Sequence, residues 1–314
     1  MTGHDTTTNS SFAPWIFIRN KHIQTLLGSR AWPILKTPNK VITLSIDTKR
    51  KCHIRLFGNN LSRIAILIHG LGGSGKSRYM LHTAHYLLHK GYDVACVSLP
   101  GVEDTSPYLY HAGDHTAFDT IAETFRKSYA EQYWIGFSLG GNMLLRWLSQ
   151  PKNIQKAVAI SPVLDLNESA ILLEQNSQRL YQWYFLRSLL ALYKNKVRNF
   201  PEIFTEYERV LSTKTIRDLD THLTCPFHGY DGLDSYYGSQ SSINTVSQIQ
   251  NKTLILSSLD DPFQSPDIVK KAQTHAPPSV SFCVSEYGGH VGFFHSPTKG
   301  VFYPTWAESF LSSS

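Results

Sequence analysis

The feature that most constrains this chain is the pentapeptide Gly136-Phe-Ser-Leu-Gly140, which lies between a strand pattern and a helix pattern. The apolar residues 133–135 precede it, and residues 139–149 repeat their apolar side chains with a helical period. A G-x-S-x-G sequence in this setting is typical of a strained strand-to-helix turn that exposes the serine hydroxyl, and only small neighbours fit beside it. The alternative is a glycine-rich turn with an inert serine. The context favours Ser138 as a nucleophile.

Apolar runs and helical patterns alternate along most of the chain. Strand patterns cover 41–46, 54–57, 64–68, 94–97, 133–135, 157–160, 253–256 and 280–284, and helix patterns cover 78–90, 116–129, 139–149 and about 303–312. The first two strands are expected to pair antiparallel. The later alternation predicts an α/β fold with a mostly parallel central sheet flanked by helices.

The alternation stops between residues 165 and 247, where the sequence is helical and rich in aromatic residues. We therefore expect a helical cap at 165–247, inserted into a core formed by 13–164 and 248–314. The length of 314 residues suits one large domain with an insertion, or two smaller domains. Residues 1–12 are polar and are expected to form a disordered tail. The aromatic segment 12–33, which contains His22 and Gln24, is expected to pack on the core.

A serine hydroxyl needs an adjacent base to become an effective nucleophile. His290 is the best candidate among fourteen histidines, because Gly288-Gly-His-Val-Gly follows the last strand pattern and forms a flexible loop. The acid is expected after the preceding strand, where Asp260 and Asp261 are both candidates; we favour Asp261, directly before Pro262. The backbone N–H groups of Leu71 and Leu139 are the expected oxyanion donors.

The loop at 70–77 also supports a rival function. Its sequence, Gly70-Leu-Gly-Gly-Ser-Gly-Lys-Ser77, satisfies the phosphate-binding pattern G-x-x-x-x-G-K-S after a strand and before a helix. A nucleotide-binding enzyme would also need a magnesium-binding aspartate at the end of another strand, and only Asp260 approaches that position. This alternative does not account for the serine turn or for the loop around His290.

Charge and cysteine content exclude several other classes. The formal net charge is +6, yet no concentrated basic patch predicts nucleic-acid binding. The densest basic segment, 194–198, is either a solvated helix end or a contact with anionic lipid. Four dispersed cysteines predict neither a zinc site nor a disulfide framework, and no metal or cofactor is expected. The sequence shows no signal peptide and no membrane span, which favours a cytoplasmic protein, with peripheral lipid contact left open.

Several motifs together resemble the YheT-like branch of α/β-hydrolases, which includes bacterial esterases and eukaryotic relatives that act on lipids. The resemblance runs from about Phe12 to the C-terminus and includes Asn20-Lys-His-Ile-Gln-Thr25, His69-Gly-Leu71, Tyr110-His-Ala-Gly113, Gly136-Phe-Ser-Leu-Gly-Gly-Asn142, Pro162-Val-Leu-Asp-Leu166, Pro226-Phe-His-Gly-Tyr230, Tyr236-Tyr237, Asp260-Asp-Pro-Phe263 and Gly288-Gly-His-Val-Gly-Phe293.

The resemblance implies an α/β-hydrolase fold and a charge-relay set of Ser138, Asp261 and His290. The implied activity is hydrolysis of carboxylic esters, lipid or acylglycerol esters among them, through an acyl-enzyme. Two positions depart from the family pattern. Gly73 stands where an acidic residue is common, and Pro100-Gly101 stands where Arg-Gly is usual. Both departures affect loops and therefore concern substrate preference rather than the charge-relay set.

Overall fold

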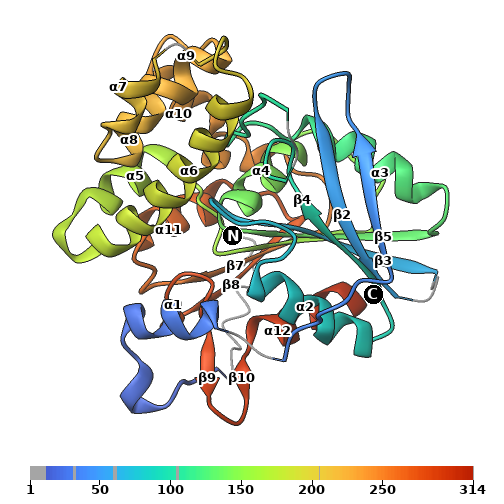
Figure 1. Ribbon diagram of the computed structural model, residues 1–314. Helices are drawn as coiled ribbons and strands as arrows, with labels where there is room; N and C mark the ends of the chain where they lie inside the picture. Colours follow the sequence, from blue (N-terminus) through green and yellow to red (C-terminus); the bar gives the residue numbers. More distant parts are fainter. Residues whose placement is uncertain (1–11, 31–32, 59–61, 104–105, 205, 314) are drawn as a thin grey trace.

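An eight-stranded sheet forms the centre of the molecule in the computed structural model, which describes residues 12–30, 33–58, 62–103, 106–204 and 206–313 (Figure 1). The strands lie in the order β1-β2-β4-β3-β5-β6-β7-β8. All neighbours from β4 to β8 pair parallel, whereas β1 and β2 pair antiparallel with each other and β2 pairs antiparallel with β4. The strand bounds are β1 Lys40–Ser45, β2 Lys51–Phe57, β3 Arg63–Ile68, β4 Asp93–Ser98, β5 Glu131–Phe137, β6 Lys156–Ile160, β7 Thr253–Ser258 and β8 Val280–Ser285.

The parallel strands are buried on both faces, as their uninterrupted apolar runs predict. In β3, Ile64, Ile66 and Ile68 belong to one apolar cluster, while Ala65 and Leu67 belong to another on the opposite face. Helices α3 (Thr116–Arg126), α4 (Leu139–Trp147) and α11 (Pro266–His275) contribute to the first cluster, and α2 (Arg78–His89) and α12 (Tyr303–Ser312) to the second. This layering confirms the predicted α/β-hydrolase architecture.

Between β6 and β7 the described residues contain helices and no strand. These helices gather on one side of the sheet (Figure 1), and all but the last of them, α10 (Leu233–Gln240), contribute to a third apolar cluster that includes Leu186, Tyr193 and Phe204. Their bounds are α5 Leu166–Glu174, α6 Arg179–Asn199, α7 Tyr207–Leu211, α8 Ile216–Leu219, α9 Cys225–His228 and α10 Leu233–Gln240. The cap boundaries at 165 and 247 stay a prediction.

The N-terminal segment packs on the core, as expected for its described part, 12–30. A 3-10 turn, η1 (Ile16–Ile18), leads into α1 (Lys21–Ser29), whose N-terminus is capped by the Asn20 side chain. The Gln24 side chain is buried and donates hydrogen bonds to the carbonyls of Ile18 and Phe294. Residues 1–11 of the predicted tail lie outside the described residues, whereas Phe12 is buried against Phe293 and Trp306.

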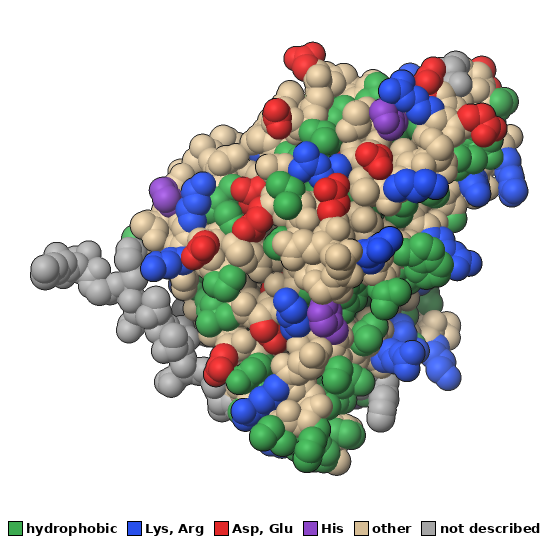
Figure 2. All heavy atoms as spheres, turned by 90° about the vertical axis from the view of Figure 1, so that its left-hand side faces the viewer, with side chains coloured by type: hydrophobic (Ala, Val, Ile, Leu, Met, Phe, Trp, Pro, Cys, Tyr) green, Lys and Arg blue, Asp and Glu red, His purple; other side chains and the backbone are tan. Residues whose placement is uncertain are grey.

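Charged side chains of both signs are interspersed over the upper part of the face shown in Figure 2. In the predicted basic segment at 194–198, Lys194 and Arg198 are exposed, but Lys196 is buried and donates a hydrogen bond to the Ser106 carbonyl across 2.6 Å. Among the helices in the described ranges, none has the length and apolar composition to span a bilayer.

Candidate active site

Ser138 lies at the turn between β5 and α4 with φ 53° and ψ −119°. A positive φ is uncommon for a residue with a side chain and strains the backbone. The turn is possible because its neighbours are glycines: a Cβ on Gly136 would lie 2.5 Å from the Gly140 carbonyl oxygen, and one on Gly140 would lie 2.4 Å from the His69 carbonyl oxygen. The turn therefore has the geometry that the G-x-S-x-G pattern predicts.

Three side chains from distant parts of the chain form a continuous hydrogen-bonded series at this turn. His290 Nε2 lies 2.7 Å from Ser138 Oγ, and His290 Nδ1 lies 2.9 Å from Asp261 Oδ2. The Asp261 side chain is 2% exposed and His290 is 8% exposed. Because Nδ1 faces a carboxylate, we assign the ring proton to Nδ1, which leaves Nε2 to accept the hydroxyl proton of Ser138.

The two neighbouring aspartates have different contacts. Asp261 accepts a hydrogen bond from the Phe263 N–H in addition to its contact with His290. Asp260 Oδ1 instead accepts a hydrogen bond from the Gly289 N–H across 2.8 Å, and burial raises the pKa of its carboxyl group. Asp261 is thus the carboxylate against the imidazole, and Asp260 holds the loop that carries it.

The loop that carries His290 is held by α1, a role that the sequence patterns did not reveal. The His290 N–H donates to Thr25 Oγ1 across 2.9 Å, and Thr25 Oγ1 donates to the Lys21 carbonyl. A Cβ on Gly28 would lie 2.5 Å from Gly292 Cα, so helix and loop are in direct backbone contact. The motif at 20–25 was visible in the sequence, but its spatial partner was not.

The same loop is also held from the sheet. The Val291 N–H donates to Ser161 Oγ, and Ser258 Oγ donates to the Gly289 carbonyl. Val291 and Ser161 both have positive φ, 54° and 44°. Such strain persists only where surrounding contacts determine the backbone, and here they fix the position of the imidazole.

The loop at 70–77 packs beside Ser138, since a Cβ on Gly70 would lie 2.9 Å from Ser138 Cβ. Within this loop the Leu71 N–H is the one amide with no acceptor among the described residues. The other amides donate as follows: Gly70 to Tyr79 Oη, Gly72 to Tyr110 Oη, Gly73 to the Gly70 carbonyl, Ser74 to Ser77 Oγ, Gly75 to Ser98 Oγ, Lys76 to Ser74 Oγ and Ser77 to the Ser74 carbonyl.

This pattern separates the two interpretations of the loop. A phosphate-binding loop offers several backbone N–H groups to one anion, but here these groups already donate within the protein. The Lys76 side chain, 64% exposed, lies 3.2 Å from a Glu103 carboxylate oxygen. Burial alone would raise the pKa of Glu103, but its bonds to Arg55, Ser98 and Lys76 lower it to about 2, so a negative charge lies where a phosphate would bind.

His69, at the start of the loop, is fully buried and neutral. Burial lowers the pKa of its imidazole to about 4. Its Nδ1 lies 2.8 Å from the Gly70 carbonyl oxygen, and its Nε2 accepts a hydrogen bond from the Leu99 N–H. These contacts hold the backbone that presents the Leu71 N–H. The N–H of Leu139 is the first of α4, where helix amides have no partner within the helix.

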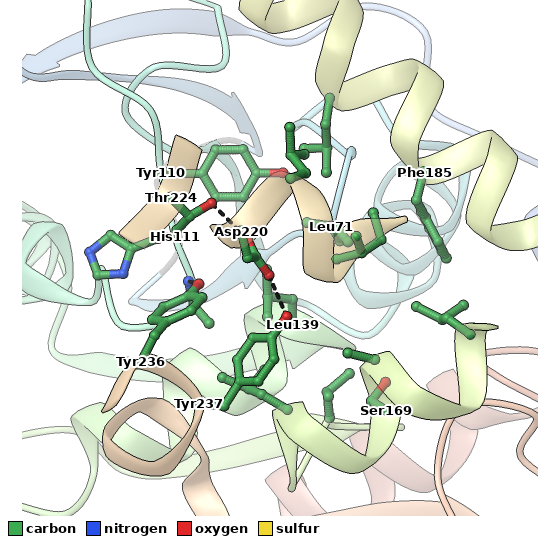
Figure 3. Close-up of a pocket in the computed structure, with 18 of the residues that line it drawn as sticks. Leu71, Tyr110, His111, Leu139, Ser169, Phe185, Asp220, Thr224, Tyr236 and Tyr237 are labelled. Carbon is green, nitrogen blue, oxygen red and sulfur yellow. Dashed lines mark hydrogen bonds between the residues drawn. The ribbon is translucent and has the colours of Figure 1, made fainter. Parts of the chain in front are cut away.

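Two cavities meet at Ser138. The larger, about 620 Å³, lies between α1 and the first half of α6, and its lining includes Tyr181, Trp183 and Tyr184. The smaller, about 110 Å³, lies beneath α5 and α8, with apolar walls (Figure 3). Ser138, Leu71, Phe185 and Phe263 line both cavities. Ser138 therefore lies where the two cavities meet.

The smaller cavity contains a buried carboxylate that sequence analysis missed. Asp220 accepts hydrogen bonds from Thr224 Oγ1 across 2.6 Å and from the Tyr237 hydroxyl across 2.7 Å (Figure 3). Burial raises the pKa of Asp220 to about 6, against the lowering effect of these two donors. No local sequence pattern marks Asp220, although in the structure it begins a π-helix, η3 (Asp220–Thr224).

Comparisons with known proteins agree with this geometry. The family model described as alpha/beta hydrolase fold matches residues 66–297. This chain belongs to the α/β-hydrolase family. Its curated relatives include Escherichia coli YheT, named as a candidate esterase, with 28% identity over 73% of this chain and 69% of that protein. This similarity confirms the resemblance to the YheT-like branch.

Two further relatives of this α/β-hydrolase have names that specify lipid esters. Human monoacylglycerol lipase ABHD2 is 22% identical over 97% of this chain and 79% of its own length. Bovine phospholipase ABHD3 is 26% identical over 73% of this chain and 57% of its own length. Among solved structures, Pyrococcus furiosus esterase Pf2001 shares the fold with a TM-score of 0.59 and 17% identity, covering 87% of this chain and 89% of that one.

Proposed function

We propose that this protein hydrolyses carboxylic esters that carry apolar acyl chains, through an acyl-enzyme on Ser138. The observation that carries the proposal is the series from Ser138 Oγ to His290 Nε2 and from His290 Nδ1 to Asp261, with contacts of 2.7 Å and 2.9 Å. A hydroxyl, an imidazole and a buried carboxylate in this order form a proton-transfer path to and from the nucleophile. The names of the relatives, an esterase and two lipid-ester hydrolases, support the same class of reaction.

In the first half-reaction, Ser138 Oγ attacks the acyl carbonyl carbon while His290 Nε2 takes the hydroxyl proton. Asp261 keeps the imidazole oriented and stabilises its positive charge without taking a proton. The N–H groups of Leu71 and Leu139 are the proposed donors to the tetrahedral oxyanion. The bond to the alcohol oxygen then breaks, and His290 returns the proton to the departing alkoxide.

In the second half-reaction, a water molecule attacks the acyl carbonyl carbon and gives a proton to His290 Nε2. Collapse of this second tetrahedral species breaks the bond to Ser138 Oγ, which recovers the proton from His290. The products are a carboxylic acid and an alcohol, and every step uses the protein side chains and water.

The two cavities provide sites for the acyl part and the alcohol part of an ester. We assign the acyl chain to the larger cavity, because Tyr181, Trp183 and Tyr184 give it an extended aromatic wall. We assign the alcohol to the smaller cavity, whose polar groups include Asp220, Thr224 and Tyr237. A ligand site with mostly apolar walls and a few convergent polar groups binds and orients a molecule that has both characters.

Activity-based labelling tests the proposal. A fluorophosphonate probe should label the wild-type protein and should fail to label Ser138→Ala. Ser149→Ala, just beyond the far end of α4, is the matched control and should be labelled like wild type. Labelling that persists in Ser138→Ala, or a wild type that neither reacts with the probe nor hydrolyses p-nitrophenyl esters of any chain length, would contradict the assignment.

The nucleotide-binding alternative is tested separately. Lys76→Ala should leave ester hydrolysis within about twofold of wild type, because this side chain is exposed and contacts Glu103 rather than the serine. Wild type should show no heat of binding for MgATP in calorimetry. Tight MgATP binding that Lys76→Ala abolishes would favour the rival function.

A further inference from the structure

Exposed apolar side chains are concentrated on one face of the molecule. Among the twelve large apolar side chains exposed in the described ranges, eight come from three segments: Trp15, Ile16, Phe17, Ile23, Leu26, Leu180, Trp183 and Tyr184. Phe17 is 87% exposed and Leu180 is 81% exposed. Single exposed apolar residues are ordinary, but a cluster of this size marks an interaction surface. We call the surface formed by residues 15–18, α1 and the first half of α6 the aromatic face.

The three segments are adjacent in space. Gln24 of α1 bonds the Ile18 carbonyl, which joins η1 to α1. His22 of α1 stacks on Tyr181 of α6 with ring centroids 5.7 Å apart, which joins α1 to α6. Figure 2 looks onto this side of the molecule and shows hydrophobic side chains gathered toward the lower edge, with Lys and Arg side chains and some Asp and Glu side chains near them. The exposed residues therefore form one continuous face rather than isolated sites.

The charged side chains of these segments are all positive. Residues 15–30 and 179–189, which span this face, together contain five Lys and Arg and no Asp or Glu, whereas the rest of the chain contains 25 Lys and Arg and 24 Asp and Glu. Arg19, Arg30, Arg179 and Arg187 are all exposed. A positive rim around apolar and aromatic side chains complements the anionic headgroups and the hydrocarbon boundary of a lipid surface.

The face also leads to the reacting centre. Leu26, Leu180, Trp183 and Tyr184 are exposed and also line the larger cavity, which extends to Ser138 and His290. A molecule partitioned into lipid could therefore enter the cavity without crossing water. Tryptophan and tyrosine are the residues that membrane interfaces favour, because their rings are apolar and their N–H or O–H groups remain hydrated.

We propose that the aromatic face docks this protein onto an anionic lipid surface, with the mouth of the larger cavity turned toward the lipid. Docking itself rests on the exposed residues and their charge, whereas delivery of an ester to Ser138 rests on the function proposed above. A protein partner or a second copy of the chain would also cover apolar residues, but the three segments of the face contain no Asp or Glu, which favours an anionic, deformable partner.

Sedimentation with vesicles tests docking. The probes are vesicles of phosphatidylcholine alone and vesicles with about one third phosphatidylserine, and the protein is the full chain carrying Ser138→Ala so that no ester is cleaved. Binding should be strong on the anionic vesicles and weaken at high salt. Because Ser138→Ala is inactive under the proposed function, vesicle binding and ester hydrolysis can fail independently.

Surface variants then identify the face. Ile16→Ser with Phe17→Ser should weaken vesicle binding at least about 20-fold, since two apolar side chains lose their burial in lipid. Val41→Ser with Ile203→Ser, which replaces two exposed apolar residues elsewhere, is the matched control and should bind like wild type. When Ser138 is left intact, the variant carrying Ile16→Ser and Phe17→Ser should retain wild-type turnover of the water-soluble p-nitrophenyl acetate.

Charge variants test whether the positive side chains of the aromatic face contribute to binding. Arg30→Glu with Arg179→Glu should lower affinity for the anionic vesicles about 10-fold or more and should abolish the preference for phosphatidylserine. Three outcomes would overturn the proposal: no binding of wild type to anionic vesicles, equal binding by the Ile16/Phe17 variant and its control, or a dimer that the Ile16/Phe17 variant dissociates while no vesicle binding occurs.

Discussion

The backbone N–H of His290 donates a hydrogen bond to Thr25 Oγ1 across 2.9 Å, so α1 holds a loop that lies 265 residues away in the sequence. Through this bond, and through the contact between Gly28 and Gly292, α1 fixes the position of the imidazole beside Ser138. Two segments from opposite ends of the chain thus have to fold together before the proposed proton path exists.

Replacing Thr25 should separate positioning from binding. Thr25→Val keeps the shape of the side chain and removes the oxygen that accepts from His290, leaving a partly buried N–H without an acceptor. We expect kcat for p-nitrophenyl butyrate to fall about 10-fold with KM within about twofold, because small displacements of a reacting group slow chemistry more than binding. Thr25→Ser retains the oxygen and should restore most of kcat. Equal kinetics for the two variants would argue against a positioning role.

The adjacent aspartates provide a matched pair. Asp261→Asn should lower kcat about 10⁴-fold, because the amide no longer fixes the protonated Nδ1 and no longer stabilises imidazolium. Asp260→Asn keeps an oxygen that can accept from the Gly289 N–H and should cost less than about 10-fold. Steady-state kinetics on one soluble ester measure both. A larger loss in Asp260→Asn would reverse the assignment of the acid.

Gly28 tests the contact between α1 and the histidine loop. In Gly28→Ala the new Cβ would lie 2.5 Å from Gly292 Cα and 2.6 Å from the Val291 carbonyl oxygen, so helix or loop has to move. We expect a lower melting temperature and a loss of kcat of about 10-fold or more. Gly238→Ala in α10, where the new Cβ would have no heavy atom within 4 Å, is the control and should be neutral or stabilise by up to about 1 kcal/mol.

The aromatic wall of the larger cavity predicts a dependence on acyl length. Each added CH₂ that enters the cavity should raise kcat/KM about fourfold, the equivalent of about 0.8 kcal/mol, until the cavity is full. Trp183→Ala should reduce kcat/KM about 10-fold for a p-nitrophenyl ester of twelve carbons, while the acetate serves as its internal control. If Trp183→Ala affected acetate and long-chain esters equally, the acyl assignment would be wrong.

Asp220 predicts a pH dependence of stability. Burial raises its pKa to about 6 in the folded protein from an ordinary 3.8, so the folded state favours the protonated form. Its contribution to stability is full below pH 3.8 and is lost as the pH rises through 6. The loss is on the order of 3 kcal/mol. Unfolding by urea should therefore show Asp220→Asn gaining stability relative to wild type between pH 4 and 7.

Asp234→Asn, an exposed aspartate of α10, is the control for that comparison and should follow the wild-type profile. A constant difference between Asp220→Asn and wild type across this pH range would mean that Asp220 has the same charge in the folded and unfolded states.

The sequence by itself determined the sheet, the serine turn and the histidine loop, because each has a local signature. Buried parallel strands appear as continuous apolar runs, and a strained turn requires glycine at fixed offsets from Ser138. Helix α1 had no such signature, and its role depends on a partner loop that is remote in the chain.

Only the tertiary structure decided which way adjacent or ambiguous groups face. Asp260 and Asp261 have the same chemistry and neighbouring positions, but the chain turns one toward Gly289 and the other toward His290. The loop at 70–77 satisfies a phosphate-binding pattern, but its amides donate to side chains such as Tyr79 and Tyr110, which the fold brings from other elements. A local pattern records which residues are present, whereas hydrogen-bond partners are fixed by contacts between distant segments, and those arise only when the chain is folded.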